Sequence, residues 1–169
     1  MPAGFDEFFR EQFPRLCLFL MRTGADRHEA EECAQEVMLQ AIQHWRRLES
    51  PAAWVRIAAM RTLANRAQRD RIGKSRELAA NNVREVAPLS EDLAELSEQQ
   101  RQVLSVLRQL PDAQRRVMAW VVDGFSATEI AKMMNTPAAT VRSNIRHARA
   151  ALRKMLDDVD QPAEGRTRS

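Results

Sequence analysis

The sequence predicts an all-α protein built from two small helical bundles. Apolar residues recur at three- and four-residue spacings along most of the chain, and no segment shows the two-residue period of a strand. Ala, Leu, Glu and Arg dominate the composition, Gly is scarce and Tyr is absent, a mixture that favours helices. An apolar share of 44% in 169 residues is enough to bury cores, so the chain is expected to fold.

The chain is expected to divide into four segments. A first bundle is predicted over residues 3–72 and a second over residues 91–158. The segment between them, residues 73–90, shows no sustained amphipathic period and contains Asn-Asn and Pro, so it is predicted to be a flexible linker. Residues 159–169 are predicted to form a disordered tail.

Capping signals place the first helices. One helix is expected within residues 3–22, with Pro14 either kinking it or lying in a first turn. Asp26 is a predicted N-cap of the next helix, with Glu29 at the capping-box position, and the first half of that helix is acidic. Ser90 is expected to cap the first helix of the second bundle.

A third helix is expected to begin near Pro51 and to end at Gly73. The residues assigned to its core-facing side are Trp54, Ile57, Ala58, Leu63 and Ala64. That assignment leaves its arginines, Arg56 among them, on the other faces of the helix.

Residues 126–156 carry the signals of a helix-turn-helix. Ser126 is expected to cap a short helix, with Glu129 at the capping-box position. Asn135 is expected to make the turn, because a short polar side chain tolerates a positive φ, and Thr136 to cap the last helix. In this arrangement the second helix enters the major groove of DNA.

Four cations on the last helix, Arg142, Arg146, Arg149 and Arg153, follow one another at spacings of four, three and four. Like charges at these spacings repel, so a polyanion is the simplest partner; a solvated basic face is the alternative. The residues expected to face bases are Thr140, Arg142, Ser143, Asn144 and Arg146. Arg149, Arg153 and Lys154 are better placed for phosphates, which add affinity without reading sequence.

Little else in the sequence indicates chemistry. The formal charge of +3 says little about partners by itself. Cys17 and Cys33, with His28 and His44 nearby, match no standard zinc spacing, and no phosphate loop or activated nucleophile is found. No metal site, cofactor or catalytic residue is therefore expected. No basic leader or membrane-spanning apolar run is found, so a cytoplasmic protein is expected.

The segment LPDAQRRVMAWVVDGFSATEIAKMMNTPAATVRSNIRHARAALRKML resembles the fourth domain of bacterial sigma factors, especially the extracytoplasmic-function (ECF) group. AEECAQEVMLQA and AWVRIAAMRTLANRAQRDR, further toward the N-terminus, resemble the second domain of the same group. The resemblance implies that the helix-turn-helix binds the promoter's minus-thirty-five element. The matching residues are Ser126, Thr128, Thr140, Arg142, Ser143, Asn144, Arg146, Arg149 and Arg153.

For the first bundle the resemblance implies docking on core RNA polymerase through the acidic helix, and capture of the opened minus-ten element by the next helix and the loop before it. The polymerase-docking residues would be Glu32, Gln35 and Glu36. The minus-ten residues would be Glu49, Ser50, Trp54, Arg56, Arg61, Asn65, Arg66 and Arg69. Trp54 fits a core anchor better than a base-stacking platform. The loop before Trp54 is shorter than in many relatives, and Arg56-Ile57 stands where others carry Tyr-Arg.

The resemblance thus implies an ECF-type sigma factor, a non-catalytic subunit that gives core RNA polymerase promoter specificity. Its expected partners are core RNA polymerase, promoter DNA and an anti-sigma factor, with no membrane insertion of its own. The alternative is a stand-alone helix-turn-helix regulator with an N-terminal dimerisation or sensing bundle, which would bind duplex DNA as a dimer without polymerase.

Overall fold

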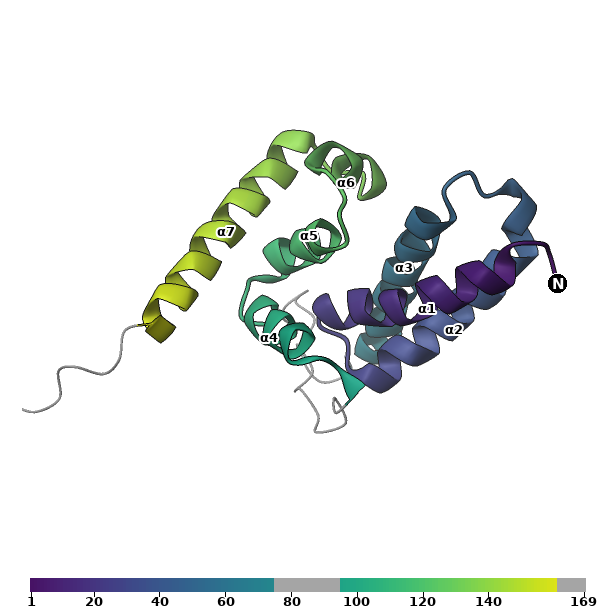
Figure 1. Ribbon diagram of the computed structural model, residues 1–169, viewed down its shortest axis with the longest axis horizontal. Coiled ribbons are helices and arrows are strands. Elements are labelled where there is room, and N and C mark those ends of the chain that lie inside the picture. The colour runs from purple at the N-terminus through teal and green to yellow at the C-terminus, as the bar shows by residue number, and fades with distance from the viewer. Residues whose placement is uncertain (75–94, 161–169) are drawn as a thin grey trace, which may run out of the picture.

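The computed structural model describes residues 1–74 and 95–160, and all regular secondary structure in these ranges is helical (Figure 1). The predicted all-α class is therefore confirmed. The first three α-helices and a short 3-10 helix are α1 (Phe5–Arg22), α2 (Arg27–His44), η1 (Trp45–Arg47) and α3 (Pro51–Lys74). The remaining helices are α4 (Glu98–Leu107), α5 (Asp112–Val122), α6 (Ala127–Met133) and α7 (Ala138–Asp160). Most of the predicted linker and tail lie outside the described residues.

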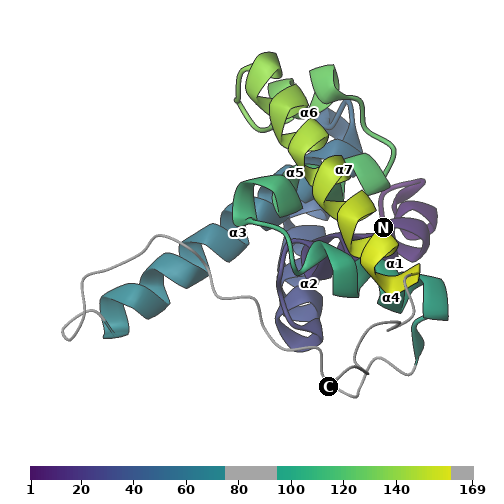
Figure 2. The ribbon, with the colours of Figure 1, turned by 90° about the vertical axis from the view of Figure 1, so that its left-hand side faces the viewer.

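Helices α1, α2 and α3 pack against one another as the first unit. The predicted cap is confirmed: the backbone N–H of Glu29 donates to Asp26 Oδ1 at 2.8 Å. Pro14 lies inside α1 without ending it, on the exposed side of the helix. The core of this unit includes Leu16, Phe19 and Val37, each fully buried. Figure 2 shows the C-terminal end of α3 extending away from the other helices.

The buried face of α3 differs from the predicted one. Val55, Ala59 and Leu63 are buried, whereas Ala64 is exposed. The apolar stripe is thus rotated by about one residue, and Trp54, Ile57 and Ala58 are only partly buried at its edges. Gly73 does not end the helix, which continues to Lys74.

The start of α4 also corrects the prediction. Ser90 lies outside the described residues, and Ser97 caps the helix instead. The backbone N–H of Gln100 donates to Ser97 Oγ at 3.2 Å, and the N–H of Ser97 donates to Gln100 Oε1 at 3.0 Å. Residues 95–97, expected to be helical, precede the α-helix.

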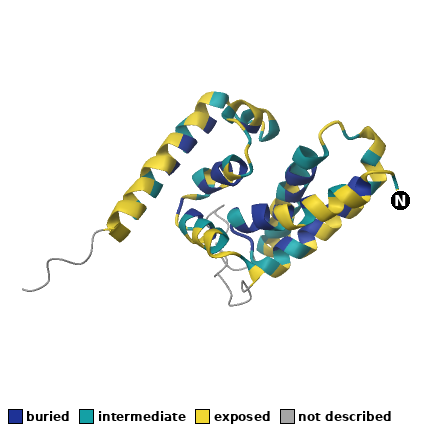
Figure 3. Cartoon of the chain, in the orientation of Figure 1, coloured by how far each residue is buried: buried dark blue, intermediate teal, exposed yellow. Residues whose placement is uncertain are grey.

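Helices α4 to α7 form the second unit, and it is packed against the first. Helix α1 contacts both α4 and α5, and the buried apolar residues of the two units form one continuous cluster. At this contact the rings of Phe19 and Trp120 meet edge to face with centroids 4.9 Å apart. Figure 3 shows buried residues on α5 and on the adjoining end of α1. The bundles predicted as separate modules therefore touch in this structure.

Candidate nucleic-acid interface

Helices α6 and α7 form the predicted helix-turn-helix. Both bonds of the Ser126 capping box are present: the N–H of Ser126 donates to Glu129 Oε2 at 2.7 Å, and the N–H of Glu129 donates to Ser126 Oγ at 3.3 Å. The Ser126 N–H, and then its hydroxyl, lower the pKa of the Glu129 carboxyl below its ordinary value. Asn135 makes the turn with φ 48°, as predicted.

The expected cap at Thr136 is wrong. The Thr136 hydroxyl donates to the Met134 carbonyl at 3.2 Å, so it is directed back at the turn. Helix α7 begins at Ala138, and the N–H of Val141 donates to the Pro137 carbonyl at 3.1 Å. Thr136 therefore lies one residue outside the capping position and helps to close the turn between the two helices.

The apolar side of α7 anchors it to α5 and α6. Val141, Ile145 and Ala148 are buried along this side, and Ile130 of α6 is fully buried with them. Because these residues recur at three- and four-residue spacings, they form one stripe and orient the rest of the helix outward. The polar face of α7 is therefore presented to solvent by packing.

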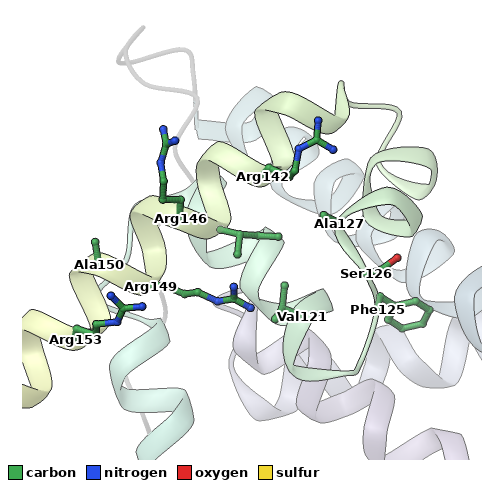
Figure 4. A pocket seen from close by; sticks show the side chains of 10 residues that line it. Val121, Phe125, Ser126, Ala127, Arg142, Arg146, Arg149, Ala150 and Arg153 are labelled. Carbon is green, nitrogen blue, oxygen red and sulfur yellow. The ribbon is translucent and has the colours of Figure 1, made fainter.

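The four predicted cations Arg142, Arg146, Arg149 and Arg153 are all exposed. They line one side of an open groove whose other side is formed by Val121 and residues 125–127. Figure 4 shows Arg149 directed across this groove toward Val121, and Arg146 directed away from it. Among the residues that the structure describes, no carboxylate pairs with any of the four.

The remaining predicted base-facing residues divide into two groups. Thr128 of α6 and Thr140 of α7 are exposed, and Ser126 is exposed at the start of α6. Ser143 and Asn144 are half-buried, because they border the packed stripe of α7. The structure thus brings the exposed hydroxyls and arginines together on one surface and leaves Ser143 and Asn144 at its edge.

The predicted polymerase-docking residues Glu32, Gln35 and Glu36 are exposed on α2. Arg66 of α3 donates to Glu36 Oε2 at 2.9 Å and to Glu32 Oε2 at 3.3 Å. The Glu36 bond is the main reason that the pKa of Arg66 is raised. A predicted DNA-contact residue is therefore paired with two predicted docking residues, a connection between α2 and α3 that the sequence did not indicate.

Most of the other minus-ten positions are accessible. Arg61, Asn65 and Arg69 line a shallow groove along α3 that also includes Trp54. Glu49 and Ser50 are exposed in the turn before α3. Trp54 is half-buried and packs against the core, as predicted for an anchor.

Arg56 does not lie on an outer face of α3, where the periodicity predicted it. It is only 3% exposed, and its guanidinium bonds to Asp123, to Gln12 and to the Ala52 carbonyl. In this conformation Arg56 cannot contact DNA. The sequence did not single out Asp123, because its partners Arg22 and Arg56 come from helices far away in the chain.

In the described ranges 1–74 and 95–160, no group of three or more His, Cys, Asp and Glu side chains could hold a metal ion. No helix within these ranges is both long and apolar enough to cross a membrane.

Two family models match the chain. Residues 8–72 match sigma-70 region 2, and residues 101–152 match sigma-70 region 4. Among curated relatives, the ECF RNA polymerase sigma factor SigK of Mycobacterium tuberculosis is 28% identical over 162 residues, covering 92% of this chain and 87% of the relative. The ECF sigma factor RpoE of Cereibacter sphaeroides is 29% identical over 159 residues, covering 91% and 87%.

Two solved structures share the fold. The sigma factor RpoE in complex with the anti-sigma factor NepR from Bartonella quintana superposes with a TM-score of 0.67 at 19% identity, covering 93% of this chain and 98% of that one. CnrH in complex with the cytosolic domain of CnrY gives a TM-score of 0.60 at 19% identity, covering 93% and 89%.

A helix-turn-helix unit that matches region 4, preceded by a three-helix unit that matches region 2, defines a transcription initiation factor of the sigma-70 class. The curated relatives place it more narrowly. The chain belongs to the extracytoplasmic-function group of the sigma-70 family.

Proposed function

We propose that this chain is an ECF-type sigma factor that binds core RNA polymerase and directs promoter-specific initiation without carrying out a reaction of its own. The observation that carries the proposal is the pairing of regions 2 and 4, in that order, with an exposed arginine surface on the second unit. Each unit takes a separate task in the assembly.

The second unit reads the minus-thirty-five element as duplex DNA. The exposed side of α7 enters the major groove, where an Arg side chain forms two hydrogen bonds to guanine. Arg142 and Arg146 lie nearest the start of α7 and take this role. Arg149 and Arg153 lie further along and contact phosphates, which position the helix without selecting sequence.

The first unit docks on core polymerase through the acidic surface of α2. Glu32, Gln35 and Glu36 are exposed and face a basic partner, since charge complementarity steers an exchangeable subunit and sets its register. Arg66 stays close to two of these carboxylates and orients them.

Helix α3 and the turn before it bind the minus-ten element. Arg61, Asn65 and Arg69 supply polar contacts along the exposed groove, with Trp54 at one end. Glu49 and Ser50 are placed beside that end, in the turn where unstacked bases would enter. Two weak DNA modules in one chain gain affinity through their effective concentration, so neither needs a large basic surface.

Two further expectations extend the proposal. An anti-sigma factor sequesters this chain by covering its docking surfaces; one solved structure with the same fold is a sigma factor in complex with an anti-sigma factor. The chain acts in the cytoplasm, where polymerase and promoter meet.

A reconstituted transcription assay tests the proposal. The purified chain and core RNA polymerase are expected to give promoter-dependent transcripts on genomic fragments, with little DNA binding by the chain alone. Binding of duplex DNA by a dimer, unchanged by core polymerase, would instead support the stand-alone regulator. Failure of core polymerase to retain the chain in a pull-down would overturn the sigma assignment.

A further inference from the structure

Asp123 joins the two units through an ion triad that is largely shielded from solvent. It follows α5 directly, at the last position before the turn into α6. Arg22 Nη1, at the end of α1, lies 2.6 Å from Asp123 Oδ1, and Arg56 Nε of α3 lies 2.6 Å from Asp123 Oδ2. One carboxylate of the second unit thus uses both oxygens to bind arginines from two helices of the first.

The triad is well enclosed. The side chains of Arg22, Asp123 and Arg56 are 12%, 9% and 4% exposed. The Arg56 guanidinium also lies 5.7 Å from the ring centroids of Phe19 and of Phe125, one from each unit. Removing one partner of a buried pair leaves the other charge uncompensated, so each member of this triad holds the others in place.

Other contacts lie along the same seam, the interface between the two units. Arg115 of α5, only 3% exposed, donates from Nε to the Thr23 carbonyl at 3.1 Å. Arg108 Nη2 donates to the Ala25 carbonyl at 2.8 Å. The turn between α1 and α2 is therefore held by arginines of the second unit, with the Phe19–Trp120 contact beside it.

Promoter geometry does not fit this closed arrangement. Elements centred near minus ten and minus thirty-five lie about 25 base pairs apart, roughly 85 Å of B-DNA at ~3.4 Å per base pair. A compact body of this size has a radius of gyration of only about 14 Å. Twenty residues of sequence join Lys74 to Glu95, and 20 residues can span at most about 70 Å, so units that separate could reach both elements.

We infer that the Arg22–Asp123–Arg56 triad is an intramolecular latch that holds this chain closed and unable to engage a promoter until core polymerase separates the two units. The inference rests on the proposed function. It also accounts for Arg56, which stands at a predicted minus-ten position and is covered by the second unit. Opening the seam would release Arg56 and Asp123 together.

The seam also has features that make it reversible. Two buried donors at the seam, Arg22 Nε and Trp120 Nε1, have no hydrogen-bond acceptor among the residues that the structure describes. These donors lack a hydrogen bond in the closed form and would bond to water in the open form. This difference lowers the free energy needed to separate the two units. The seam thus combines a paired central triad with two donors that gain hydrogen bonds when the units separate.

Replacing Asp123 with Asn tests the latch in the full chain. Small-angle scattering of the free protein is expected to show a compact wild type and a larger radius of gyration for D123N. In the wild type only the open molecules bind core polymerase, so the apparent affinity is lowered in proportion to their fraction. D123N opens more of the molecules and is expected to bind core polymerase about tenfold more tightly or better. Glu98→Gln is the control, since Glu98 is exposed and pairs with Arg101 of its own helix, away from the triad.

A second variant, Arg56→Gln, breaks the same triad from the other unit and serves if D123N does not fold. Circular dichroism must show that both variants keep the helicity of the wild type. If the triad acts as one unit, the double variant should gain little core affinity beyond either single variant. An extended free wild type, or a D123N variant as compact as wild type with unchanged core affinity, would overturn the latch. Wild type that core polymerase does not bind at all would instead overturn the proposed function.

Discussion

Ser126 and Glu129 hold each other at the start of the helix-turn-helix, each accepting a hydrogen bond from the backbone N–H of the other. These two bonds satisfy donors that the first turn of α6 would otherwise leave unmet. Because α6 has only seven residues, the cap is a large part of what keeps it helical and in place against α7.

Ser126→Ala is expected to lower the free energy of unfolding by about 1 kcal/mol, the typical loss on removing a serine cap. Urea unfolding followed by circular dichroism measures it. Ser105→Ala is the control, since Ser105 is exposed within α4, and its effect should stay within about 0.5 kcal/mol. Equal effects of the two substitutions would show that the capping box does not stabilise α6.

The capping box should also make stability depend on pH. The bonds from Ser126 lower the pKa of Glu129 below its ordinary value of 4.5. A lowered folded-state pKa means that the stabilisation is present above pH 4.5 and is lost as pH falls through the lowered value. The difference in unfolding free energy between wild type and Glu129→Gln should therefore shrink on acidification below that point. A difference that stayed constant across this range would contradict the assignment.

Replacing Arg142 or Arg146 is expected to change sequence preference, whereas replacing Arg153 is expected to change overall DNA affinity. Arg142→Ala or Arg146→Ala should cost about 1–3 kcal/mol on the preferred minus-thirty-five sequence and relax that preference. Arg153→Ala should weaken binding evenly across sequences and reduce its salt dependence, because it removes a phosphate contact. Competition binding of the holoenzyme to promoter variants at several salt concentrations distinguishes the two effects. Uniform loss on all sequences from Arg142→Ala would count against its role as a base reader.

Local signals predicted most of the local structure, although the expected cap at Thr136 is wrong. The caps at Asp26 and Ser126 and the turn at Asn135 each depend on residues within a few positions, and each is confirmed. The helix face assigned to Arg56 was wrong, because its partner Asp123 lies 67 residues away and no local pattern connects the two. Sequence periodicity treats an arginine as a solvent-facing residue, and only the tertiary fold shows that this one is neutralised and buried.

The docking and DNA residues were predictable to different degrees. Exposure of the α7 arginines followed from the apolar stripe at Val141 and Ile145, which fixes the opposite face. The pairing of Arg66 with Glu32 and Glu36 could not be foreseen, because it depends on how α2 and α3 cross.

The two cysteines should react slowly with thiol reagents in the folded protein. Cys33 is fully buried, and burial raises the pKa of Cys17 to about 12 from its ordinary value of 9.0. Since the thiolate is the reactive form, reaction with a disulfide reagent at pH 8 should be at least about tenfold slower than for a free thiol. Both thiols should react at once in urea; fast reaction of either one in the native protein would contradict the burial.

The raised pKa of Cys17 has a consequence for alkaline stability. Its neutral form is favoured in the folded state, so this stabilisation is complete below pH 9 and is lost as pH rises toward 12. Cys17→Ser, whose hydroxyl does not titrate there, should lose less stability than wild type over that interval. Parallel urea midpoints for the two proteins from pH 8 to 10.5 would contradict the assignment.

Charge reversal at Glu36 tests the polymerase-docking surface. Glu36→Lys should weaken binding to core polymerase by about tenfold or more, since it removes an attractive charge and places a cation beside Arg66. Glu36→Gln should have a smaller effect of the same sign. Glu11→Lys is the control: Glu11 is also exposed and paired with an arginine, Arg15, but on α1 outside the proposed surface. Fluorescence titration with core polymerase at two salt concentrations measures the affinity of all three variants. Equal losses of affinity from Glu36→Lys and Glu11→Lys would show that the acidic surface of α2 is only a solvated helix face and not a docking surface.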